Sequence, residues 1–180
     1  TITGGFYGVA LTGGSATGTP IFDNQVTGNT ILDFYNNGVY MTGNQNALIQ
    51  ANDLRRPTRN TVTNCFAIFV TGLNTKCNIN RNRVSNPFGG NPTSTSAAAG
   101  VYITGCDATL GAENIVSNNL VYDFNGEGIQ YGLYNSSSDF VKYYHNTISL
   151  QDNGQTGTTA TYGFFQTLQA ESIDFKNNII

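Results

Sequence analysis

Residues 100–105 read Gly-Val-Tyr-Ile-Thr-Gly, and residues 38–43 read Gly-Val-Tyr-Met-Thr-Gly. Related copies are residues 8–13, residues 67–72 and two weaker ones that begin at Gly128 and Gly163. Apolar side chains alternate along each copy, which predicts a short β-strand with one buried face. The predicted inward pairs are Val9/Leu11, Val39/Met41, Ile68/Val70, Val101/Ile103 and Ile129/Tyr131.

A second motif alternates with the first: an apolar residue, two variable positions, Asn, one variable position and another apolar residue. Its Asn residues are Asn24, Asn52, Asn82, Asn118, Asn146 and Asn178, between 28 and 36 residues apart. A period that drifts in this way is typical of a solenoid whose turns carry loops of different length. Asn tolerates left-handed backbone, and its amide can bond to the next turn, so we expect an inward Asn ladder with a structural role. A third strand is expected in the longer coils, for example at residues 30–35.

Composition narrows the class of protein. Charged residues make up 11% of the 180 residues, the net charge is -3, and there is no basic run, which argues against nucleic acid as a partner. No apolar run approaches the length of a membrane span. The three cysteines, Cys65, Cys77 and Cys106, lack metal-ligand spacing and are expected to be structural thiols, with a Cys65–Cys77 or Cys77–Cys106 disulfide left open.

The repeats support a resemblance to a known class. Together with residues 141–150 (Val-Lys-Tyr-Tyr-His-Asn-Thr-Ile-Ser-Leu), 162–166 and 173–180, they make the chain resemble right-handed parallel β-helix proteins of the pectate-lyase-like superfamily. More narrowly, it is similar to large secreted or cell-surface proteins of Bacteroidetes that the type IX system exports. The resemblance implies an all-β, right-handed parallel β-helix (solenoid) of about six coils. Residues 1–180 are expected to form a single segment cut from a longer extracellular polypeptide. The superfamily hosts lyases, hydrolases, adhesins and structural shafts, so fold alone leaves the function open.

Candidate catalytic groups are few. Asp53 and Arg83 would be neighbours in successive coils, with Arg81 close by, and we expect a surface salt bridge there. A polysaccharide lyase would need several carboxylates for Ca²⁺ beside an Arg or Lys base. A glycoside hydrolase would need a carboxylate pair, for which Asp123 and Asp152 are the candidates. His145, the single histidine, has no partner of a metal-binding kind. The sequence therefore predicts no cofactor, no metal and no catalysis, with such a lyase or hydrolase as the alternative.

The outward positions of the first motif predict a binding face. One predicted row contains Ala10, Tyr40, Phe69, Tyr102, Gln130 and Phe165, and the row beside it contains Thr12, Thr42, Thr71, Thr104, Gly132 and Thr167. Exposed aromatic rows tend to mark contact surfaces, and sugar rings stack on aromatic faces. We therefore expect this face to bind a polysaccharide or cell-surface glycan. The expected binding residues are Tyr40, Phe69, Tyr102 and Phe165 with Thr42, Thr71 and Thr104.

Two alternatives stay open for this face and for the chain as a whole. Residues 86–99 could fold over the aromatic row and bury it. The segment could also act as a structural shaft or filament subunit, with further coils of the parent chain or copies of itself stacked end to end.

Overall fold

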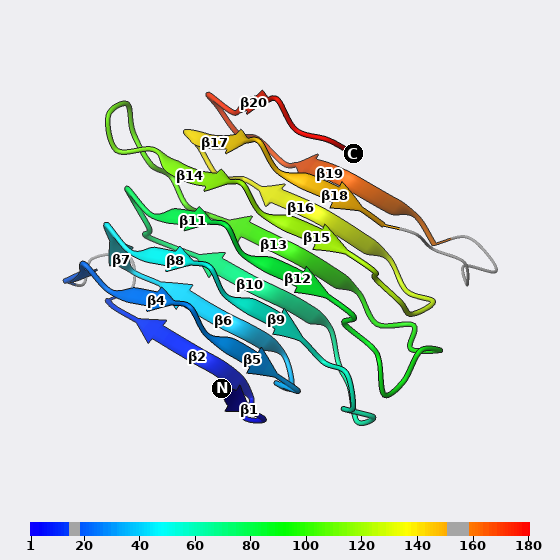
Figure 1. Ribbon diagram of the computed structural model, residues 1–180. Coiled ribbons are helices and arrows are strands. Elements are labelled where there is room, and N and C mark those ends of the chain that lie inside the picture. The colour runs from blue at the N-terminus through cyan, green and yellow to red at the C-terminus, as the bar shows by residue number, and fades with distance from the viewer. Residues whose placement is uncertain (15–18, 151–158) are drawn as a thin grey trace.

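The chain forms a parallel β-solenoid, described here by a computed structural model for residues 1–14, 19–150 and 159–180 (Figure 1). Every regular element in those ranges is a β-strand, and the strands are collected into three long parallel sheets and one short one. Each long sheet is six strands deep, so the chain makes about five full turns, close to the predicted number of coils. No helix among the described residues has the length and hydropathy that crossing a membrane requires.

Each coil contributes one strand to each long sheet. Sheet A contains β1 (Ile2–Thr3), β5 (Thr30–Leu32), β9 (Asp53–Arg55), β12 (Arg83–Ser85), β15 (Leu120–Tyr122) and β18 (Thr147–Ser149). Sheet B contains β2 (Tyr7–Thr12), β6 (Asn37–Thr42), β10 (Cys65–Thr71), β13 (Ala98–Thr104), β16 (Gln130–Ser136) and β19 (Thr161–Thr167). Sheet D contains β4 (Gln25–Thr27), β8 (Leu48–Gln50), β11 (Asn78–Asn80), β14 (Asn114–Ser117), β17 (Val141–Tyr144) and β20 (Asp174–Lys176). The short sheet C pairs β3 (Ile21–Phe22) with β7 (Asn44–Gln45).

Alternate side chains of the sheet B strands fill the interior as predicted, with one exception. The inward pairs from β6, β10 and β13 are all buried, and Val9 and Leu11 of the first coil are partly buried against them. In β16 the predicted pair Ile129/Tyr131 is wrong, because the register places Leu133 opposite Val101.

Gly132 explains the shift in β16. Gly132 lies opposite Gly100 of β13. A Cβ atom on Gly100 would come within 2.6 Å of the Gly132 carbonyl oxygen and 2.7 Å of the Val121 side chain, so the two strands approach too closely there for a side chain. The glycine that matches the repeat is therefore Gly132 and not Gly128, and Tyr131 turns outward.

The predicted inward Asn ladder lies at the corner between sheets D and A. Its members are Asn29, Asn52, Asn82, Asn119, Asn146 and Asn178. Asn82 shows the pattern: its Oδ1 accepts hydrogen bonds from the backbone N–H and the Nδ2 of Asn52 at 3.0 and 2.9 Å. Its own Nδ2 donates to the Ile49 carbonyl at 2.8 Å and to Asn119 Oδ1 at 3.0 Å. The ladder thus satisfies buried polar groups at every corner it occupies.

Two members of the ladder differ from the prediction. Asn118 was expected, but it is exposed and takes the left-handed backbone conformation (φ 55°), while Asn119 turns inward. The reason is the register: Val116, and not Ile115, lies opposite the inward Ile79, and Asn119 follows Val116 by three positions. Asn24 is likewise replaced by Asn29, which follows the inward Val26 of β4 by three positions.

Arg56 is fully buried and joins three segments of backbone. Its Nε donates to the Pro87 carbonyl at 2.6 Å, Nη1 to the Tyr35 carbonyl at 2.7 Å and Nη2 to the Thr63 carbonyl at 3.1 Å. The guanidinium carbon also lies 4.8 Å from the centroid of the Phe88 ring. Burial lowers the pKa of this group. A guanidinium is the side chain that can supply donors in several directions, so Arg56 holds the backbone at this corner together.

The three thiols are free and buried, and neither of the disulfides left open by the sequence forms. Burial raises the pKa of Cys65 and Cys77 to about 11 and that of Cys106 to about 12. Such thiols are protonated at neutral pH and behave as small apolar side chains.

Candidate binding face

The outward face of sheet B carries a continuous row of aromatic side chains. The β-ladder registers align Ala10, Tyr40, Phe69, Tyr102, Tyr134 and Phe165 in consecutive strands. Tyr40, Phe69, Tyr102 and Phe165 thus lie in one row, as expected. The predicted Gln130 does not belong to it: Gln130 is fully buried, and Tyr134 takes its place for the same reason that Gly132 replaces Gly128.

A second aromatic row, which sequence reasoning missed, runs beside the first. It aligns Tyr7, Asn37, Phe66, Ala99, Tyr131 and Tyr162. The available signal was an aromatic residue three positions before the first-row aromatic in three strands: Phe66, Tyr131 and Tyr162. We call the nine rings of the two rows the aromatic strip: Tyr7, Tyr40, Phe66, Phe69, Tyr102, Tyr131, Tyr134, Tyr162 and Phe165.

The rings of the aromatic strip contact one another along its whole length. Tyr102 and Tyr134 stack with centroids 4.2 Å apart and planes 7° apart, and Tyr7 stacks on Tyr40 at 4.7 Å. Phe69 bridges these two pairs, with centroid distances of 5.9 Å to Tyr40 and 5.0 Å to Tyr102. Parallel strands about 4.8 Å apart bring equivalent side chains to this separation. Neighbouring rings therefore restrict one another's side-chain rotations.

The strip is partly accessible. Tyr7 is exposed, and the other eight rings are half-buried, because each shares part of its surface with its neighbours. Residues 86–99, the segment that could have covered the strip, bond to neighbouring loops: Asn91 donates to the Asn60 carbonyl, and the Glu127 N–H donates to the Ser94 carbonyl. Its last two residues, Ala98 and Ala99, belong to β13. These loops do not bury the strip.

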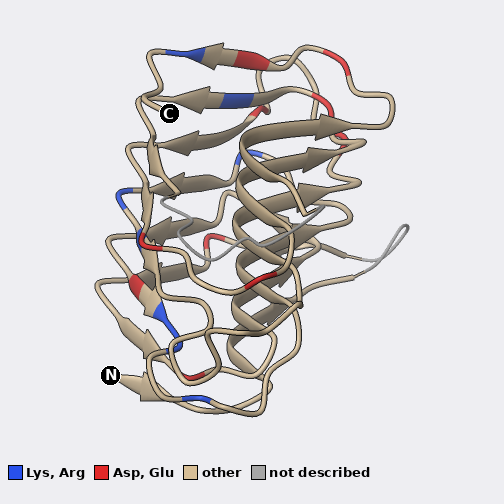
Figure 2. Ribbon diagram, turned by 90° about the vertical axis from the view of Figure 1, so that its right-hand side faces the viewer, with Lys and Arg blue, Asp and Glu red and all other residues tan. Residues whose placement is uncertain are grey.

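A hydroxyl row flanks the strip at the carboxyl ends of the strands. It aligns Thr12, Thr42, Thr71, Thr104, Ser136 and Thr167, so Thr42, Thr71 and Thr104 lie together as expected, and Ser136 stands where Gly132 was predicted. Sheet B contains no Asp, Glu, Lys or Arg in any of its six strands, in contrast with the strands of sheet D such as β17 and β20 (Figure 2). The aromatic strip and its hydroxyl row form an uncharged surface.

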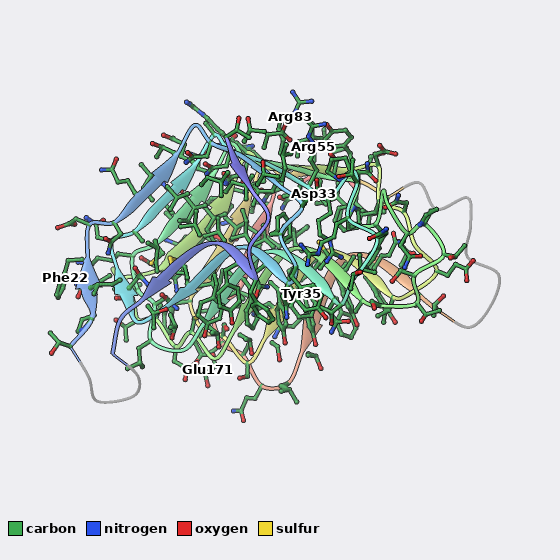
Figure 3. The ribbon with its side chains drawn as sticks, turned by 90° about the horizontal axis from the view of Figure 1, so that it is seen from below. Phe22, Asp33, Tyr35, Arg55, Arg83 and Glu171 are labelled. Atoms are coloured by element: carbon green, nitrogen blue, oxygen red, sulfur yellow. The ribbon has the colours of Figure 1, made fainter. Side chains whose placement is uncertain are left out.

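The candidate catalytic residues lie elsewhere, in a groove of about 330 Å³ on sheet A that contains Asp53, Arg55, Arg83, Tyr122 and Asp123. Arg55 and Arg83 project from the same side of the molecule (Figure 3). Asp53 lies opposite Arg83 in the sheet as predicted, but the ion pair that forms is between Asp53 and Arg55, at 3.4 Å.

Arg83 forms a hydrogen bond with a tyrosine instead. Its Nη2 donates to the Tyr122 hydroxyl at 3.1 Å, and this contact lowers the pKa of Tyr122. Arg81 is exposed at the neighbouring corner with φ 57°. The groove thus holds two carboxylates and two guanidinium groups whose charges balance.

The remaining catalytic candidates are the Asp123/Asp152 pair and His145. Asp152 lies outside the described residues, so its predicted pairing with Asp123 stays a prediction. His145 is exposed at a corner with φ 56°. Within the part of the chain that the structure describes, no three His, Cys, Asp or Glu side chains are arranged to hold a metal ion.

Comparison with protein-family models, curated proteins and solved structures gave no match to this chain. The structure shows a parallel β-solenoid, and no family match supports the narrower resemblance to the pectate-lyase-like superfamily.

The chemistry available on sheet B is contact and hydrogen bonding. Stacked tyrosines offer ring surface and hydroxyl groups, and the adjacent threonines can donate and accept hydrogen bonds. Such a surface suits an extended ligand with both apolar faces and hydroxyl groups.

Proposed function

We propose that this chain is a non-catalytic β-helix segment of a large secreted or cell-surface protein and that it attaches to polysaccharide through the aromatic strip. The resemblance to pectate-lyase-like β-helix proteins and to type IX-exported surface proteins supports the extracellular setting. The observation that carries the binding role is the unbroken row of ring contacts from Tyr7 to Phe165 on an accessible face.

The proposed binding rests on the complementary surfaces of the aromatic strip and a sugar ring. A pyranose ring presents C–H groups on its faces and hydroxyl groups on its edge, and an aromatic ring beside a hydroxyl side chain satisfies both. Tyr102 with Thr104, and Phe69 with Thr71, supply that combination in successive strands. Because the rings already support one another, ordering them on binding costs little conformational entropy, which favours affinity.

A retention assay on insoluble polysaccharides tests the proposal. The variant Tyr102→Ala/Tyr134→Ala removes the closest stacked pair, and it is expected to lose retention while keeping the far-UV spectrum of the native chain. The matched control is Tyr122→Ala/Tyr144→Ala, which removes two outward, half-buried tyrosines from sheets A and D. Equal retention of both variants, or no retention of the native chain on any glycan, would overturn the proposal.

A second candidate role is a structural shaft. Among the described residues, β1, β2 and β4 at one end and β19 and β20 at the other each have one neighbour in their long sheet. At the second edge of β18, Thr147 forms a single bridge with Ile179. Phe175, Ile179 and Ile180 are exposed at this end of the solenoid. We propose that the strands at the two ends pair with further coils of the parent chain or with copies of the same chain. Light scattering that grows with protein concentration, independent of glycan, would favour copies.

A further inference from the structure

The charge of sheet B limits the chemistry of its ligand. Its six strands carry no acidic or basic residue, whereas the chain as a whole has 8 Lys and Arg and 11 Asp and Glu. The Arg59 guanidinium packs 4.9 Å from the centroid of the Tyr35 ring and bonds to the carbonyls of Thr61 and Asp33, none of which belongs to a strand of sheet B. No row of positive charge follows the strip.

An anionic polymer would gain nothing from this surface. Placing a carboxylate against aromatic rings removes water from the charge without supplying a counter-charge, and that desolvation is costly. The net charge of -3 adds a weak repulsion. A neutral sugar meets neither penalty.

The spacing of the rings limits the shape and direction of the ligand. Along the first row the centroid distances are 5.9, 5.0, 4.2 and 5.4 Å from Tyr40 to Phe165. An extended pyranose chain with equatorial linkages advances by about one ring length per sugar, close to the strand spacing of about 4.8 Å. A chain parallel to the solenoid axis can therefore place one sugar on each coil. A chain laid along a strand would meet only two rings, such as Tyr131 and Tyr134.

We propose, building on the proposed function, that the ligand of the aromatic strip is an uncharged, extended, equatorially linked glycan that runs parallel to the solenoid axis with one sugar per coil. The strip thus selects against acidic polysaccharides by lacking counter-charges. It selects against axially linked, coiled glycans because their sugars leave the plane of the sheet.

The test measures, by calorimetry, the affinity of the native chain for β-1,4-linked gluco-oligosaccharides of two to eight units. Affinity is expected to rise with each sugar until the oligomer spans the six strands of sheet B, and then to level off. Raising the salt from about 50 mM to about 500 mM is expected to change the affinity less than about twofold, because no ion pair forms. Tyr102→Ala/Tyr134→Ala is expected to weaken the six-unit oligomer about tenfold or more.

A charge-insertion variant tests the preference for an uncharged ligand separately from the direction of the ligand along the solenoid. Thr104→Lys places an ammonium group on the outward, half-accessible row beside Tyr102 and is expected to create salt-dependent binding of β-1,4-linked oligoglucuronate, the acidic counterpart of the neutral series, which the native chain should not bind. Native binding of β-1,4-linked oligoglucuronate in preference to the neutral series would overturn the charge argument. A plateau at two or three sugars would overturn the axial direction. Binding of no oligosaccharide and no insoluble glycan would instead overturn the proposed function itself.

Discussion

Tyr102 and Tyr134 lie one coil apart and stack with their ring centroids 4.2 Å apart and their planes 7° from parallel. They are directly opposite each other in neighbouring strands β13 and β16. The parallel β-solenoid imposes this relation because every outward residue has an equivalent one strand spacing away. Aromatic residues at equivalent positions therefore form a stack, and in this protein the stack is the most distinctive feature of the surface.

The Asn ladder is expected to be a main source of stability. Asn119→Ala removes the acceptor for the backbone N–H and Nδ2 of Asn82 and the donor to the Ile79 carbonyl, all in the interior. Leaving such groups unpaired should lower the free energy of unfolding by about 3 kcal/mol, measured by urea denaturation. Asn118→Gly is the control, because its exposed position has a φ of 55° that glycine adopts freely, and we expect a change of at most about 0.5 kcal/mol. Equal losses in the two variants would contradict the observed ladder.

Arg56 is expected to be far more sensitive than its neighbour Arg55. Arg56→Lys keeps the charge but cannot reach the carbonyls of Tyr35, Thr63 and Pro87 together, so it leaves buried acceptors unpaired. We expect a loss of about 3 kcal/mol or more in the free energy of unfolding. Arg55→Lys changes a side chain that is 42% exposed and should cost less than about 1 kcal/mol. Unfolding of the two variants at the same urea concentration would contradict a stabilising role for the Arg56 hydrogen bonds.

Alkaline pH is expected to destabilise the fold through its thiols. The folded-state pKa values of Cys65, Cys77 and Cys106 are raised to about 11, 11 and 12, whereas unfolded thiols titrate near pH 8.5. Between about pH 9 and pH 11 the unfolded state has therefore released protons that the folded state keeps. The free energy of unfolding should fall with rising pH in this window, by up to about 1.4 kcal/mol per thiol and pH unit.

The control for the alkaline effect is a variant with all three cysteines replaced by alanine, whose stability should fall less steeply over the same pH range. In the native chain at pH 8, a thiol reagent should react with the cysteines only after unfolding. Rapid labelling of the folded chain would show that the thiols are not buried as described.

Tyr122 is expected to ionise more readily than an ordinary tyrosine. The Arg83 guanidinium donates to its hydroxyl and favours the phenolate, which lowers the pKa of Tyr122. Arg83→Gln should raise that pKa, measured by the chemical shift of the labelled tyrosine ring during titration. Arg81→Gln, at the exposed corner nearby, should leave it unchanged. An unshifted Tyr122 in the Arg83 variant would show that the contact is absent in solution.

The prediction of local features succeeded where a strong pattern recurs in consecutive coils. The Gly-Val-Tyr-x-Thr-Gly copies in β6 and β13 place Tyr40 and Tyr102 outward and Val39 and Val101 inward, and the registers agree. It failed where a coil contains two matches to the same motif. Asn118 and Asn119 both follow an apolar residue by three positions, and Gly128 and Gly132 both precede an apolar residue.

The amino-acid sequence by itself determined that this chain coils into a parallel β-solenoid, that the ladder is made of Asn and that one face is aromatic. These follow from side-chain alternation and from left-handed corners, which are local properties of the chain. Only the tertiary structure decided which Asn turns inward and that Tyr134 completes the row with Tyr102. The reason is that register depends on a hydrogen-bonding partner one coil away, such as the Asn82 N–H that selects Asn119, and on the contact of Gly100 with Gly132.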